Sequence, residues 1–137
     1  MREIIFRGKR ADNGKWVYGS LLIDPDLEYY NIIGFNYYNS EDGLEREEFT
    51  EEVIPETVGQ YTGLKDKNGT KIFEGDIVEG LDYTQEDEGC GIVGFNDGAF
   101  EVSGNNCVGT FHENYWGTDF EVIGNIYDNI ELLEVAE

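Results

Sequence analysis

Hydrophobic residues along this chain alternate with polar ones or form short runs, and turn residues separate these runs every eight to twelve positions. Apolar residues almost never recur at the spacing of about 3.6 positions that an amphipathic helix requires. The 18 glycines and only two prolines also favour many short connected elements over long helices. The pattern therefore predicts a mainly β protein, arranged as a small barrel or sandwich.

The beginning of the chain predicts a β-hairpin over residues 3–23. Two apolar segments, IIF and WVYGSLLI, flank the sequence Asp12-Asn13-Gly14. Asn and Gly accept the left-handed backbone of tight hairpin turns, so the chain is expected to reverse here. Trp16 and Tyr18, in the second segment, are expected to lie in the core.

An aromatic segment and an acidic segment follow this hairpin. Residues 28–38, EYYNIIGFNYY, are rich in aromatic and β-branched side chains and predict one or two strands. Residues 41–52, EDGLEREEFTEE, are mostly acidic. We expect this second segment to be the most mobile connection in the chain, or a single helical turn if it is ordered.

Turn residues recur at regular intervals in the second half of the chain. Residues 66–69 (DKNG), 74–76 (EGD) and 96–98 (NDG) each predict a reversal between short apolar strands, and residues 119–127 predict the last strand. This order is what an SH3-like barrel would show. We therefore expect an N-terminal β-hairpin subdomain over residues 1–62.

The second expected subdomain is a C-terminal SH3-like small barrel over residues 63–137, and the two are expected to pack as one compact unit. A chain of 137 residues is long enough to bury a core without disulfide or metal staples. Aromatic residues make up 14% of the sequence and supply burial that the modest hydrophobic share of 39% does not.

Neither a membrane span nor a secretion signal is expected. No apolar run approaches the 18 or more residues that a transmembrane helix needs, and the apolar residues 4–6 are too few for the core of a signal peptide. Cys90 and Cys107 have no CxxC spacing, so we expect two reduced thiols in a cytoplasmic protein. A disulfide in a secreted protein is the alternative.

The net charge of −21 is unevenly distributed. Residues 1–71 hold all nine Lys and Arg residues with 14 of the 30 acids, and residues 72–137 hold the other 16 acids and no base. Nucleic-acid binding requires Lys and Arg to displace counterions from phosphate, so direct binding of DNA or RNA by the second half is disfavoured. An acidic surface suits basic protein partners, metal cations or solubility alone.

No motif predicts catalysis, a cofactor or a bound metal. The glycines of residues 58–80 lack both the spacing of a phosphate-binding loop and a following helix. The DKNG turn has its glycine at the wrong position for a calcium loop. The one histidine, His112, lies five residues from Cys107, and a hydrogen-bonded structural histidine is the better interpretation. We therefore expect a protein that is not an enzyme.

Two exposed groups are candidate protein-interaction residues. One is an acidic loop and the other is a pair of aromatic residues in the sequence FHENYWGTDF. Tyr and Trp supply a large contact area at low entropic cost, although they could equally cover the barrel core. The candidate residues are Asp82, Glu86, Asp87, Glu88, Tyr115 and Trp116.

Four blocks of the sequence resemble the YopX family of small proteins from bacteriophages and prophages. They are FRGKRADNGKWVYGSL, IPETVGQYTGLKDKNGTKIFEGDIV, GFNDGAF and EVIGNIYDNIELL, and together they span nearly the whole chain. The resemblance implies a mostly β protein with an SH3-type barrel in its C-terminal part, made in the host bacterial cytoplasm. It implies no catalytic activity. Ile130 stands where the family commonly has a proline.

The leading functional hypothesis is a non-enzymatic phage accessory protein that binds a host or phage protein through its acidic C-terminal half. That half would imitate nucleic acid on a basic surface. The alternative is a self-assembling homo-oligomer without a foreign ligand, in which N-terminal hairpins pair edge to edge. The basic residues of the N-terminal part could then dock on an acidic half, either in a neighbouring copy or within the same chain. These basic residues are Arg2, Arg7, Lys9, Arg10 and Lys15.

Overall fold

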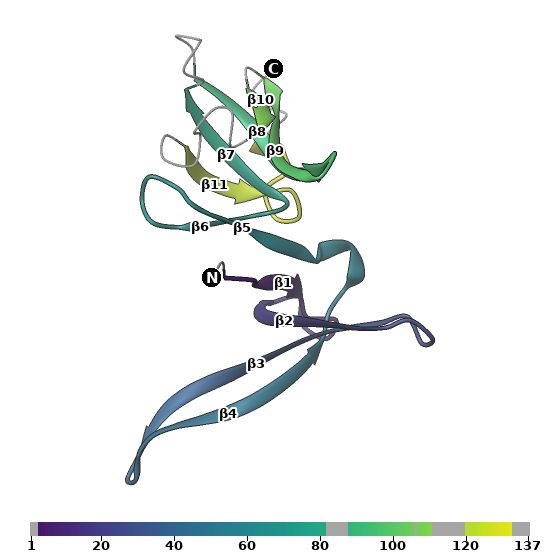
Figure 1. Ribbon diagram of the computed structural model, residues 1–137, viewed down its shortest axis with the longest axis vertical. Coiled ribbons are helices and arrows are strands. Elements are labelled where there is room, and N and C mark those ends of the chain that lie inside the picture. Colours follow the sequence, from purple (N-terminus) through teal and green to yellow (C-terminus); the bar gives the residue numbers. More distant parts are fainter. Residues whose placement is uncertain (1–2, 82–87, 106, 111–119, 133–137) are drawn as a thin grey trace. The chain divides into compact units, whose positions relative to one another are not determined.

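The computed structural model describes residues 3–81, 88–105, 107–110 and 120–132 (Figure 1). Its strands are all paired antiparallel, and the chain divides into two compact units, Met1–Gln60 and Tyr61–Glu137. The division expected from the sequence placed the border two residues later. Within the described ranges, no helix has the length and apolar character needed to cross a membrane.

The first unit is a meander of strands that a short 3₁₀ turn connects to the fifth strand. Neighbouring strands follow the order β4-β3-β2-β1-β5. The elements are β1 (Phe6–Lys9), β2 (Trp16–Asp24), β3 (Tyr29–Ser40), β4 (Gly43–Glu52), η1 (Pro55–Thr57) and β5 (Gly59–Lys65), whose first two residues belong to this unit.

The hairpin predicted over residues 3–23 is confirmed. β1 pairs with β2 from Phe6↔Gly19 to Lys9↔Trp16, and Gly14 in the connecting turn has a φ of 72°. The expectation of a buried Tyr18 is wrong, because 49% of it is exposed. β1 and β3 pair with the edges of β2, and pairing along an edge does not cover the face on which Tyr18 lies.

The prediction of a mobile loop or helical turn over residues 41–52 is wrong. Residues 43–52 form β4, which pairs with β3 along its whole length from Ser40↔Gly43 to Asn31↔Glu52. Glu41 and Asp42 form the turn, and Gly43 follows it with a φ of 108°. Acidic side chains are compatible with a strand here because both faces of the hairpin are largely exposed.

The second unit contains a five-stranded sheet and a smaller hairpin. The sheet has the order β10-β9-β8-β7-β11, and the remainder of β5 pairs with β6. The strands are β6 (Lys71–Phe73), β7 (Asp76–Leu81), β8 (Glu88–Asn96), β9 (Ala99–Asn105), β10 (Cys107–Thr110) and β11 (Glu121–Asn125).

The three turns predicted in this half are present. Gly69 and Gly75 have φ values of 83° and 88°, and the β8–β9 hairpin turns through Asp97 and Gly98 at 52° and 83°. Two consecutive residues at positive φ are the mark of a type I′ turn, which matches the twist of the flanking strands.

The mainly β class is confirmed, whereas closure into an SH3-like barrel is not observed. β10 and β11 are the two edges of the sheet, and the described strands show no pairing between them. The core packs against one face of this sheet. Its buried members are Ile72, Val78, Val93, Val102 and Phe120, with Phe100 and Val122 packed beside them.

A buried carboxylate joins the β5–β6 turn to β11. Asp66 is 6% exposed and accepts hydrogen bonds from the backbone N–H groups of Asn68 (2.8 Å), Thr70 (2.9 Å) and Val122 (2.9 Å). Burial by itself would raise the pKa of this carboxyl, but the three N–H donors together outweigh it and hold the pKa below its ordinary value of 3.8. The ionised carboxylate therefore stabilises this fold.

Candidate functional site

The five-stranded sheet of the second unit carries acidic charges and no basic one in its strands. The acids are Asp76, Glu79, Glu88, Glu101 and Glu121. Asp76 is buried, and its Oδ2 accepts a hydrogen bond from the Phe73 N–H at 2.7 Å, so this carboxylate serves the turn that begins β7. The other acids are surface charges or lie at the strand ends.

Two of these acids face one another across neighbouring strands. Glu79 of β7 lies directly opposite Glu121 of β11. Like charges in this arrangement repel and weaken a sheet. Partial compensation comes from the β5–β6 turn, where Lys67 Nζ lies 3.8 Å from Glu121 and Asn68 donates a hydrogen bond to the same carboxylate at 3.2 Å. The pair nevertheless leaves a locally negative surface.

The basic residues of the second unit all lie between positions 65 and 71, in the β5–β6 hairpin. Lys67 is engaged with Glu121, and Lys71 Nζ lies 5.5 Å above the ring of Tyr61. Cations at this distance from a ring face are attracted by it. Beyond this hairpin the unit has only acidic charge, so the charge segregation seen in the sequence falls within one compact unit of the structure.

The predicted interaction residues are mostly outside the described part of the chain. Asp82, Glu86, Asp87, Tyr115 and Trp116 fall in the ranges 82–87 and 111–119, so their grouping into a surface stays a prediction. Glu88 begins β8 opposite Leu81, and only its backbone is described. His112 also lies outside the described residues.

Two basic residues of the first unit, Arg7 and Lys9, contact an aromatic ring within that unit. Arg7 is 6% exposed, and its guanidinium lies 4.6 Å above the ring of Trp16, with Lys9 Nζ at 5.5 Å from the same ring. The side chain of Lys9 and that of Arg7 therefore cover an aromatic face.

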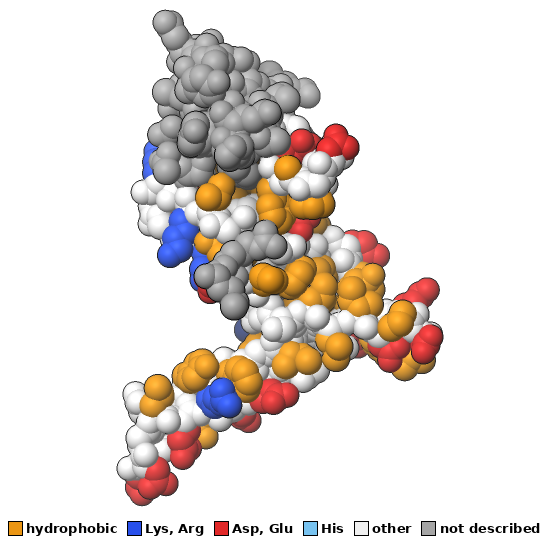
Figure 2. Space-filling view, viewed as in Figure 1, with side chains coloured by type: hydrophobic (Ala, Val, Ile, Leu, Met, Phe, Trp, Pro, Cys, Tyr) orange, Lys and Arg blue, Asp and Glu red, His pale blue; other side chains and the backbone are white. Residues whose placement is uncertain are grey.

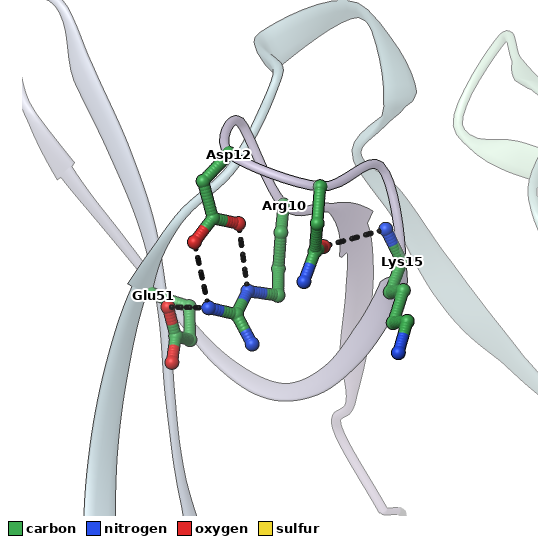
Figure 3. Close-up of polar contacts among 5 residues, drawn as sticks. Arg10, Asp12, Lys15 and Glu51 are labelled. Atoms are coloured by element: carbon green, nitrogen blue, oxygen red, sulfur yellow. Dashed lines mark hydrogen bonds and ion pairs between the residues drawn. The ribbon is translucent and has the colours of Figure 1, made fainter.

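Arg10 is held by two carboxylates (Figure 3). Its Nε and Nη2 donate to the two oxygens of Asp12 at 3.0 and 2.8 Å, and Nη2 lies 3.3 Å from Glu51. The hydrogen bond from Arg10 lowers the pKa of Asp12 below its ordinary value, and the same bond raises the pKa of Arg10. Asn13 accepts a bond from the Lys15 N–H at 2.9 Å, so the polar groups of this turn satisfy one another.

An exposed apolar surface on the β3–β4 hairpin was not predicted from the sequence. Figure 2 shows hydrophobic side chains along this hairpin. Phe35, Tyr37 and Leu44 are 42%, 63% and 71% exposed, and the Arg46 guanidinium lies 4.4 Å above the Phe35 ring. The alternating pattern that signals a strand does not say whether another layer covers it, so the sequence offered no signal for this exposure.

The fold and these surfaces define a class: a small all-β protein of two antiparallel units, with exposed aromatic residues on the first and a segregated acidic charge on the second. A family model described as YopX protein matches residues 5–134. The chain therefore belongs to the YopX family, as the resemblance of its sequence blocks implied.

A solved structure shares this architecture over nearly its full length. The crystal structure of protein EF1440 from Enterococcus faecalis is 28% identical in sequence and superposes with a TM-score of 0.64. The match covers 97% of this chain and 99% of that one. A search of curated proteins returned no match.

Proposed function

We propose that this protein is a non-enzymatic phage accessory protein that acts in the host bacterial cytoplasm by binding another protein through its acidic C-terminal unit. The observation that carries the proposal is that the strands of one sheet carry acidic residues and no basic one, including the opposed pair Glu79 and Glu121. Repulsion between Glu79 and Glu121 weakens the sheet of the free protein. A basic partner surface that neutralises this pair in a complex explains why both acids are present.

The partner in this proposal is a nucleic-acid-binding protein of the phage or host. Duplex DNA carries about one negative charge per 1.7 Å of its axis, so its binding proteins present dense Lys and Arg surfaces. A unit with 16 acids among residues 72–137 offers such a surface a comparable ligand. An SH3-like arrangement of this unit is part of the same proposal.

We expect a triple variant of the sheet, Glu79→Gln/Glu101→Gln/Glu121→Gln, to bind its partner about tenfold more weakly than the wild type. Three interface charges at roughly 0.5 kcal/mol each amount to about that factor. The measurement is affinity purification of the tagged protein from phage-infected cells, with the captured protein quantified by mass spectrometry at low and high salt.

The matched control makes the same chemical change on the first unit, at three exposed positions of β4: Glu45→Gln/Glu47→Gln/Glu48→Gln. This variant has the same net charge as the sheet variant and should retain its partner. Equal weakening by both variants would assign the effect to overall charge, and a partner whose capture is insensitive to salt would refute binding by charge.

A further inference from the structure

One edge of β3 is open over residues 34–40. β2 pairs with β3 only from Asp24↔Tyr29 to Ser20↔Ile33, whereas β4 follows the opposite edge of β3 to Ser40. No other strand in the described ranges pairs with β3. Alternate residues of this seven-residue segment therefore present backbone N–H and C=O groups along an edge that another strand can extend.

This open edge lacks the charges that usually protect a strand from pairing. β3 spans residues 29–40, which is the longest stretch of the sequence without Asp, Glu, Lys or Arg. The outer edge of the hairpin, β4, carries five Glu residues and one Arg over ten positions. Charged side chains on an edge oppose association, so the hairpin has one protected edge and one unprotected edge.

The outer part of the β3–β4 hairpin also has few stabilising interactions with other strands. Beyond Ile33 it consists of two strands, and a two-stranded hairpin is marginally stable in water. Residues directly opposite in an antiparallel pair share a face, which places Phe35 and Tyr37 on the same side as Leu44 and Arg46. This face exposes on the order of 300 Å² of apolar surface, which is the size of a functional patch.

We propose that this edge binds a second copy of the same chain. The two β3 strands pair antiparallel about a two-fold axis at Tyr37, the midpoint of residues 34–40. The product is a continuous four-stranded sheet in the order β4-β3-β3-β4, in which the two apolar faces adjoin. The inference does not depend on the proposed function, since it concerns the first unit and not the acidic second unit.

The uncharged sequence of β3 allows a second copy to be the occupant. Each copy has a net charge of −21, so two copies repel and can approach closely only where neither carries charge. In the proposed register Asn36 lies opposite Tyr38, Phe35 opposite Asn39 and Gly34 opposite Ser40 of the second copy. No like charges meet along this line. A self-complementary contact about a two-fold axis is also the commonest arrangement of soluble homo-oligomers.

The test is a double substitution on β3, Asn36→Lys/Tyr38→Lys. Within one chain these positions lie opposite Glu47 and Glu45, so the new lysines form favourable cross-strand pairs and the hairpin should persist. Across the two-fold axis, Lys would lie opposite Lys at two places. The substitution also lowers the net negative charge of the protein, so a general charge effect would favour association and oppose the predicted result.

Size-exclusion chromatography with light scattering measures the mass at micromolar concentration. We expect the wild type at twice the chain mass of 15.6 kDa and the double-lysine variant at the mass of one chain. Glu45→Gln/Glu47→Gln, with the same change in net charge on β4, should remain dimeric. Amide hydrogen exchange over residues 34–40 should slow with increasing concentration in the wild type and not in the double-lysine variant, whose circular dichroism spectrum reports whether it is folded.

Two results would overturn the inference. One is a wild type that stays monomeric and whose exchange over residues 34–40 does not change with concentration, which would leave this edge to a foreign strand. The other is a folded double-lysine variant with the same dimeric mass as the Glu45→Gln/Glu47→Gln control.

Discussion

The Gly19→Ala variant is expected to lose about 3 kcal/mol or more of unfolding free energy. A Cβ atom at this position would lie 2.2 Å from the backbone oxygen of Ile33, a distance that no side-chain rearrangement can relieve. Gly19 is the last residue of β2 that pairs with β1, and Ser20 is the first that pairs with β3. The missing side chain therefore permits β2 to pass from one partner strand to the other.

Urea titration followed by circular dichroism measures this loss. The control is Gly94→Ala, because Gly94 is also in a strand, has an ordinary φ and has no neighbouring atom within 4 Å of the point where an alanine Cβ would lie. That change should alter stability by less than about 0.5 kcal/mol. A Gly19→Ala protein with the same urea midpoint as the control would show that β3 does not approach β2 this closely.

Removal of the Asp66 carboxylate is the second substitution with a large expected effect. Asp66→Ala leaves three backbone N–H groups without their acceptor in a buried turn and should cost about 3 kcal/mol. Asp66→Asn keeps one acceptor oxygen and should cost less. Both should loosen the attachment of β11, which hydrogen exchange at the Val122 amide would detect.

The effect of Asp66 should depend on pH in a defined direction. Its folded-state pKa lies below the ordinary value of 3.8, so its contribution is complete above that value and is lost as the pH falls through the lower, folded-state pKa. The stability difference between the wild type and Asp66→Asn should therefore be constant from neutral pH to about pH 5 and shrink in more acidic solution. Asp97→Asn, at an exposed turn of the same unit, is the control. A difference that grows on acidification would contradict this assignment.

Turn chemistry made much of the fold predictable. Gly14, Gly69, Gly75 and Gly98 all adopt positive φ values, which few residues other than glycine tolerate, so the reversals were visible in the sequence. β4 was not predictable in the same way. Its charges suggested a solvated loop, and only its pairing with the uncharged residues of β3 makes it a strand.

The candidate surfaces were less predictable than the turns. The segregation of charge is visible in the sequence itself. The opposition of Glu79 and Glu121 is not, because it depends on the pairing of two strands separated by about forty residues. The exposure of Tyr37 and Leu44 depends on a third strand ending early, at the pairing of Ser20 with Ile33. No local pattern in the sequence of β3 indicates where its pairing with β2 ends.

The pairing of β1 with β5 has a consequence for folding during synthesis. Most strand pairs in this protein join neighbours in sequence, but Phe6 pairs with Gln60 and Arg7 with Gly59, across more than fifty residues. Local hairpins close within microseconds, whereas a distant pairing must first overcome the entropy of the chain between its ends. The N-terminal unit can therefore form its hairpins on the ribosome, but its sheet is completed only after residue 60 has emerged.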